Sequence, residues 1–172
     1  TLPRVPPGAR CFVFELVPGV QVHVDPRQVS PQAEFLREQA RHWIALDGRV
    51  NAKPCVLGAG PFWNADHHVG VDRLLTPCAA KQVLQGLQGR RSTIKRFEVS
   101  GQLCLNVAVN DADLDVCLAL ALLQRHKTIQ EQGLGKSMSR LVDLQDRIDR
   151  RGGCLPLDPN AAITRAMAWI NE

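Results

Sequence analysis

The sequence lacks the features that would point to a membrane protein or to a cysteine-built scaffold. No apolar run approaches the roughly 18 residues that a membrane helix needs, and the Pro-rich residues 1–10 contain no apolar core of a secretory signal. The six cysteines include no C-x-x-C pair, which argues against a zinc ribbon or a small disulfide framework. Their mostly apolar neighbours predict small buried side chains in a reducing compartment, which indicates a cytoplasmic protein.

Strong charge, internal repeats and low-complexity tracts are also absent. Lys and Arg total 21 against 17 Asp and Glu, and the resulting charge of +4 is too small to predict nucleic-acid binding by itself. With 45% hydrophobic residues, the 172-residue chain can bury a core without disulfides or metal. We expect a single α/β domain over residues 1–172, with residues 1–10 as an extended lead-in. Because the chain begins with Thr, we also consider that it is an excised part of a longer protein.

The order of the expected elements predicts the fold class. The patterns predict a hairpin over 11–24, a helix from Ser30-Pro31 to Gly48, and strands over 55–58, 93–99 and 102–109. They also predict helices that begin near Thr76 and near Asp158, and helices over 116–123 and 139–151. This alternation predicts a layered α/β fold with a mainly parallel sheet flanked by helices and an N-terminal β-hairpin. Ligands of such folds bind at the carboxyl ends of the strands.

The triplet Asp66-His67-His68 is the first segment that could carry chemistry. Carboxylate oxygens and imidazole nitrogens are suitable ligands for Mn, Fe, Co or Zn. Neighbouring histidines in a strand or loop point in different directions. One would therefore bind a metal, while the other serves a second metal, a phosphate or the shell around the ligands. The alternative is a surface turn that happens to hold two histidines.

Asp111, Asp113 and Asp115 form the second segment, at the end of the expected strand 102–109. One of them can cap the helix that follows. Three carboxylates so close together repel one another, and a bound divalent cation would relieve that repulsion. We therefore expect at least one of them to bind metal. Because this segment and the triplet both follow strands, we expect them to share one edge of the sheet.

A third acidic group lies in the expected helix over 139–151, where Asp143, Asp146 and Asp149 recur. Arg147 and Arg150 stand four residues after Asp143 and Asp146, so local ion pairs explain much of the pattern. The functional alternative is that Asp146 or Asp149 completes the metal site.

Two of these motifs resemble the DHH phosphoesterase superfamily, which includes RecJ-type nucleases, oligoribonucleases and manganese-dependent inorganic pyrophosphatases. The resemblance lies in Asp66-His67-His68 followed by the helix start at residues 76–80, and in the D-x-D segment 110–119 leading into an apolar helix. The similar region covers about 66–123. Its two motifs stand in the opposite order to those of the family, and the family's usual second substrate-binding domain would need more chain.

The resemblance implies that Asp66, His67, Asp111 and Asp113 bind divalent cations, with Mn²⁺ first and Mg²⁺ or Zn²⁺ as alternatives. It implies that His68 is catalytic, as a further ligand or a phosphate contact, while two cations activate a water and hold a phosphate oxygen. Basic side chains would clamp the phosphate, and Arg90 and Arg91 are the candidates.

The resulting hypothesis is a metal-dependent phosphohydrolase that acts on a phosphate ester or anhydride, including a nucleotide or oligonucleotide. Its partner is a phosphate-containing small molecule or a short nucleic acid, not a membrane. The first alternative is a non-catalytic α/β module that binds RNA or a nucleotide through its Arg-rich patches. The second is an enzyme in which Cys78, near a helix start, is the nucleophile and His67 or His68 is its base.

Overall fold

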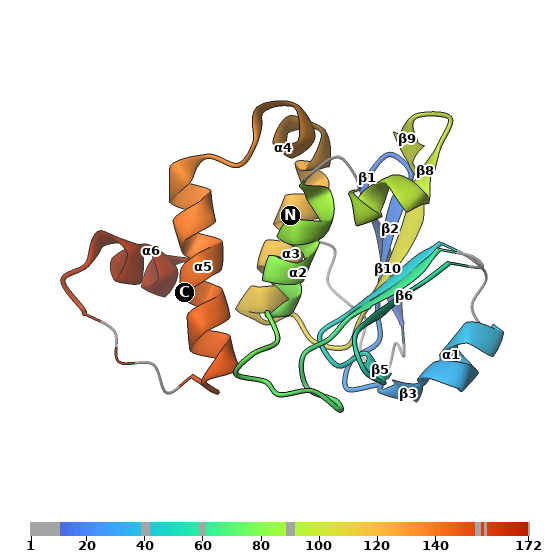
Figure 1. Ribbon diagram of the computed structural model, residues 1–172, viewed down its shortest axis with the longest axis horizontal. Coiled ribbons are helices and arrows are strands. Elements are labelled where there is room, and N and C mark those ends of the chain that lie inside the picture. Colours follow the sequence, from blue (N-terminus) through green and yellow to red (C-terminus); the bar gives the residue numbers. More distant parts are fainter. Residues whose placement is uncertain are drawn as a thin grey trace.

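A six-stranded sheet forms the centre of the computed structural model, which describes residues 11–38, 42–58, 61–88, 92–153, 156 and 158–171 (Figure 1). From edge to edge the strands are β1 (Phe12–Val17), β2 (Val20–Val24), β10 (Leu105–Val109), β4 (Trp43–Leu46), β7 (Phe62–Ala65) and β6 (Cys55–Leu57). The four central strands are parallel, and each edge strand is antiparallel to its neighbour. The expected α/β fold, with a mainly parallel sheet and an N-terminal hairpin, is confirmed.

The two faces of the sheet are covered by different helices, α2 (Ala79–Leu87) and α3 (Leu114–Gln124) on one face and α1 (Gln32–Glu38) on the other. The other helices are α4 (His126–Gln132), α5 (Lys136–Arg150) and α6 (Ala162–Asn171). Helices α2 and α3 lie beside the sheet, and α5 lies on their far side (Figure 1). Smaller elements are β3 (Ser30–Pro31) with β5 (Val50–Asn51), the 3₁₀-helix η1 (Thr93–Phe97), and β8 (Glu98–Val99) with β9 (Gln102–Leu103).

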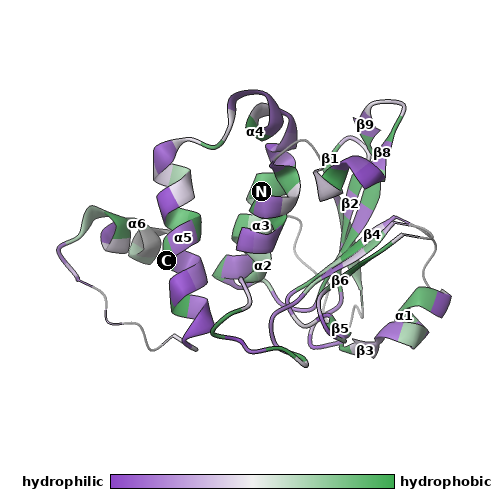
Figure 2. Ribbon diagram, viewed as in Figure 1, coloured by the Kyte–Doolittle hydropathy of each residue, from purple (hydrophilic) through white to green (hydrophobic). Residues whose placement is uncertain are grey.

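Two apolar cores lie on opposite faces of the sheet. The larger one joins strand residues such as Ile44 and Val107 to Leu84 of α2 and Leu122 of α3. The smaller one is aromatic and forms around Phe35 of α1. Hydrophilic residues make up much of α5 (Figure 2), so α5 is an outer helix that packs against α2 and α3 and turns a polar face outward.

The helix expected from Ser30-Pro31 to Gly48 is wrong. Helix α1 ends at Glu38, and residues 43–46 form the strand β4. All four side chains of β4 are buried because the strand has parallel neighbours on both sides and a core on each face. A fully buried strand is apolar throughout, so its sequence does not alternate and is easily taken for a helix segment. The strand expected over 93–99 is likewise mostly the 3₁₀-helix η1.

The burial expected for the cysteines is mostly wrong. Of the five cysteines that the structure describes, only Cys78 is buried, while Cys55 is half-buried and the other three are exposed, namely Cys11, Cys104 and Cys117. All five are free thiols. Within the described residues, no helix combines the length and the apolar character that crossing a membrane would require.

Gly86 gives a test of how closely α2 packs on the sheet. A Cβ atom at this position would overlap the indole ring of Trp63 in β7. We expect Gly86→Ala to lower the free energy of unfolding by roughly 1–3 kcal/mol through overpacking, although alanine is intrinsically the better helix former. Chemical denaturation measures the change. Gly58→Ala is the matched control, because a Cβ there has no neighbour within 4 Å, and equal stability of the two variants would contradict the packing.

Candidate metal centre

Acidic residues follow two neighbouring parallel strands at the same edge of the sheet. Asp47 comes directly after β4, and Asp66 directly after β7. Asp47 has a φ of 41° and is followed by Gly48 with a φ of 74°. Aspartate is one of the few residues with a Cβ that adopt this left-handed region readily, and the tight turn leaves the Asp47 carboxylate at the strand end.

Asp66 organises the loop that carries the histidines. Its side chain is fully buried. One carboxylate oxygen accepts the backbone N–H groups of His67 and His68, at 2.7 and 3.0 Å, and the other accepts that of Val69 at 3.3 Å. These bonds hold the chain in a turn in which His67 is buried and His68 lies partly at the surface.

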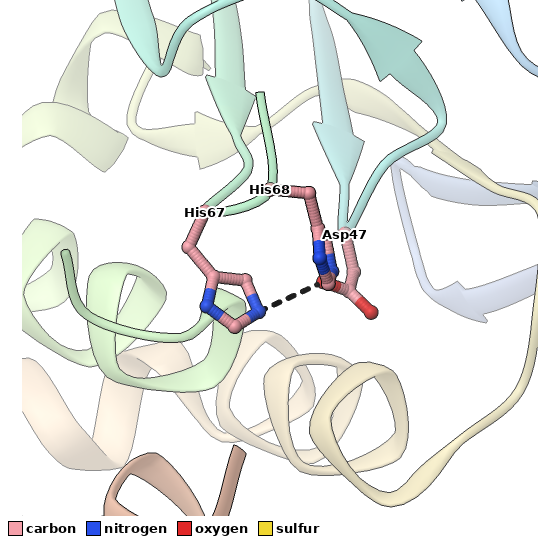
Figure 3. A group of neighbouring side chains, drawn as sticks. All are labelled: Asp47, His67 and His68. Carbon is pink, nitrogen blue, oxygen red and sulfur yellow. Dashed lines mark hydrogen bonds and ion pairs between the residues drawn. The ribbon is translucent and has the colours of Figure 1, made fainter. Parts of the chain in front are cut away.

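His67 lies between two carboxylates (Figure 3 shows one of them). Its Nε2 atom is 3.3 Å from Oδ1 of Asp47 and 3.1 Å from Oδ2 of Asp149, which comes from α5. Both contacts are ion pairs when the imidazole is protonated. Within the described residues, neither ring nitrogen of this fully buried imidazole has a hydrogen bond of regular geometry, and neither does Oδ2 of Asp149. Buried polar atoms are normally satisfied, so this arrangement calls for another binding partner.

Two overlapping groups of possible ligands share Asp47 and His67. One adds His68, and the other adds Asp115 and Asp149; in each group the ligand atoms lie within 4.8 Å of one another. The second histidine places Nε2 at 2.8 Å from Oδ1 of Asp47. Mixed imidazole and carboxylate ligands suit Mn²⁺, Fe²⁺ and Zn²⁺. The donor set therefore fits a divalent cation.

The charges of the cluster shift its pKa values in opposite directions. Burial alone would lower the pKa of His67, but Asp149 and Asp47 raise it to about 9. Burial would raise the pKa of Asp47, yet the two imidazoles hold it well below its usual range. Burial raises the pKa of Asp115 to about 6. It also raises the pKa of Asp113, which the charges of Asp47 and Asp149 increase further.

Helix α2 begins beside this cluster and is capped by carboxylates from other helices. Asp115 of α3 accepts the N–H groups of Ala79 and Ala80, at 2.7 and 2.9 Å, and Asp146 of α5 accepts that of Cys78 at 2.9 Å. Free N–H groups at a helix start favour negative charge. Asp115 therefore has a structural partner as well as a place near the metal ligands.

The structure brings together some of the residues predicted from sequence. His67 and His68 belong to the groups described above. Asp66 instead holds their loop, and Asp113 caps α3 by accepting the N–H of Val116 at 2.9 Å. Asp111 is exposed and accepts the N–H of Ala112. Within the described residues these three aspartates are outside both groups, and their role as ligands stays a prediction, while Arg90 and Arg91 lie outside the described residues.

Asp149, one of the two alternatives named on the acidic helix, reaches the site, whereas Asp146 caps α2 and forms an ion pair of 3.0 Å with Arg150. Sequence reasoning missed Asp47. Its signal was an Asp-Gly turn after a short apolar run, which is typical of a residue at the end of a buried strand. The signal was hidden because that run was assigned to a helix.

No family model, curated protein or solved structure matches the chain. The resemblance to the DHH superfamily therefore depends on the quoted motifs alone. The metal centre depends on the distances and burial given above.

The geometry disfavours Cys78 as a nucleophile. Its thiol is buried, and burial together with the charge of Asp115 holds its pKa far above the usual range. Only the thiolate is reactive, so this cysteine packs as a small apolar side chain.

The pKa of His67 gives a test in the metal-free protein. A folded-state pKa of about 9, against an ordinary 6.5, means that its interaction with the carboxylates stabilises the fold fully below pH 6.5 and is lost as pH rises to about 9. We expect the free energy of unfolding in EDTA to fall by on the order of 3 kcal/mol over this interval. Chemical denaturation across pH measures it, and an equally steep fall in His67→Gln would contradict the assignment.

Proposed function

We propose that this protein is a divalent-metal-dependent phosphohydrolase that acts on a phosphate ester or anhydride, such as a nucleotide or a short oligonucleotide. The observation that carries the proposal is the buried His67 imidazole, which lies between two carboxylates and has no hydrogen bond of regular geometry among the described residues. A metal ion is the partner that satisfies an imidazole nitrogen and two carboxylate oxygens together. The resemblance to the DHH motif is the reason to propose a phosphate ester or anhydride as the substrate.

We assign one cation to Asp47, His67 and Asp149, and a second to the side of Asp47 that faces His68. The overlap of the two ligand groups supports this division. Mn²⁺ is the first choice, with Mg²⁺ and Zn²⁺ as alternatives. When bound, such cations polarise a phosphoryl oxygen and lower the pKa of water.

The side chains of the protein have separate tasks in this proposal. Asp66 fixes the turn through three backbone N–H groups. Contrary to the expectation that neighbouring histidines point in different directions, both imidazoles turn Nε2 toward Oδ1 of Asp47. Asp47 orients His68 through the 2.8 Å contact and keeps it near the surface, where a phosphate can approach. Both ligand histidines must lose a proton to bind metal, and the raised pKa of His67 makes binding favour alkaline pH.

The binding-module alternative stays open at Arg90 and Arg91, which lie outside the described residues. It predicts salt-sensitive binding of nucleic acid that does not need metal. The cytoplasmic location expected from the cysteines is part of our proposal, and the five free thiols are consistent with it.

The first experiment compares carboxylates on one helix. Asp149→Asn removes a charged ligand next to His67, and we expect it to lower Mn²⁺ affinity at least tenfold and to lower hydrolysis by 100-fold or more. Calorimetry measures the affinity. The activity is measured as release of p-nitrophenol from bis-p-nitrophenyl phosphate, of phosphate from pyrophosphate and of a mononucleotide from a dinucleotide, which separates the substrate classes. Asp143→Asn is the matched control, because this exposed residue of α5 pairs with Lys81 outside the cluster.

Asp111→Asn then separates the two sets of ligands. The resemblance predicts that this variant loses activity, whereas the clustered side chains predict that it retains activity while Asp47→Asn loses it. Wild-type protein that binds no Mn²⁺ and hydrolyses none of the three substrates would contradict the proposed function. Metal-independent, salt-sensitive binding of RNA by the same preparation would favour the binding module.

A further inference from the structure

We propose that Arg73 is the residue that binds the phosphoryl group of the substrate beside the metal centre. This inference rests on the proposed function and names a contact that the sequence motifs do not include. Arg73 lies in the loop between the histidines and α2, and its Nη2 atom donates to Oδ1 of Asp149 at 2.8 Å. The other oxygen of the same carboxylate faces His67 at 3.1 Å.

One carboxylate thus separates the arginine from the metal ligands. Asp149 turns one oxygen to the imidazole and the other to the guanidinium, so a cation on the His67 side leaves the contact with Arg73 in place. Asp149 in turn lies beside His67, the neighbour of His68. The side chains of Arg73 and His68 are 38% and 33% exposed, so both are open to a ligand that comes from solvent.

The guanidinium of Arg73 has donors to spare. In the part of the chain that the structure describes, its hydrogen-bonded partner is Asp149 and its buried Nε has none, while its side chain is 38% exposed. Arg49 is 4% exposed and uses two nitrogens on Ser30 and Asp25. Arg150 uses two nitrogens on a backbone carbonyl and Asp146. Of these three arginines, Arg73 is the most exposed and binds through the fewest nitrogens. A pair of phosphate oxygens is an acceptor that a guanidinium fork fits well.

The loop does not depend on Arg73 for its shape. Arg150 donates to the carbonyl of Leu74 at 2.8 Å, and Asp146 accepts the N–H of Cys78 at 2.9 Å. Gln82 donates to the carbonyls of Asp66 and Pro77, at 2.7 and 2.8 Å. These four contacts join the loop to α5 and α2 from several points. Removing the Arg73 side chain should therefore change binding more than folding.

The experiment uses inorganic phosphate as the probe. Calorimetry measures the Kd of Mn²⁺ for the wild type and for Arg73→Gln, and then the Kd of phosphate for each protein at saturating Mn²⁺. We expect the Mn²⁺ affinity to change less than threefold and the phosphate affinity to fall at least tenfold. Arg73→Lys should restore part of the loss, because it keeps the charge without the planar fork. Arg147→Gln, which removes an exposed arginine two residues from Asp149, should behave as the wild type.

Three results would overturn the inference while leaving the metal site intact. The first is equal phosphate affinity of the wild type and Arg73→Gln. The second is a loss of Mn²⁺ affinity with unchanged phosphate affinity at saturating Mn²⁺, which would make Arg73 a positioning residue for Asp149. The third is Mn²⁺ binding by the wild type with no phosphate binding. Failure of the wild type to bind Mn²⁺ would instead overturn the proposed function, and this inference with it.

Discussion

The site depends on the hydrogen bonds between the first N–H groups of α2 and carboxylates of two other helices. The residue before this helix offers no capping side chain, and its first free N–H groups are bound by Asp115 of α3 and Asp146 of α5. Two carboxylates distant in sequence thus join three helices at one point. Because a helix start favours negative charge, the charges can be buried there, and the loop that carries Arg73 must end at this junction.

The carboxylates near this junction also explain how His67 is buried at a charged place. Asp115 and Asp146 are neutralised in part by helix N–H groups, but Asp47 and Asp149 are not. These two carboxylates face His67 and raise its pKa to about 9. In the metal-free protein a protonated His67 imidazole balances part of this charge. In our proposal, metal binding exchanges that proton for a cation.

The sequence was sufficient to predict the fold class, and it named two residues of the candidate cluster, His67 and His68. Alternating apolar patterns and turn residues predicted the hairpin and the mainly parallel sheet, and the triplet Asp66-His67-His68 located the loop. Asp47 was missed because β4 is apolar on both faces, which hides the strand period. The contribution of Asp149 was named only as one of two alternatives, because which face of α5 turns inward depends on packing against α2 and α3. Asp149 and His67 are far apart in the sequence, and no local pattern shows that they meet in the fold.

Asp115 shows how the two roles of a buried carboxylate compete. Both of its oxygens accept N–H groups of α2, and burial raises its pKa to about 6. A cation that took one of these oxygens would remove a cap, which costs about 1 kcal/mol. Asp47, His67 and Asp149 do not cap α2, and within the described residues Oδ2 of Asp149 has no hydrogen bond of regular geometry. These three side chains can therefore hold a cation without disturbing α2. In our proposal Asp115 is thus the support of the site, and the other three are its ligands.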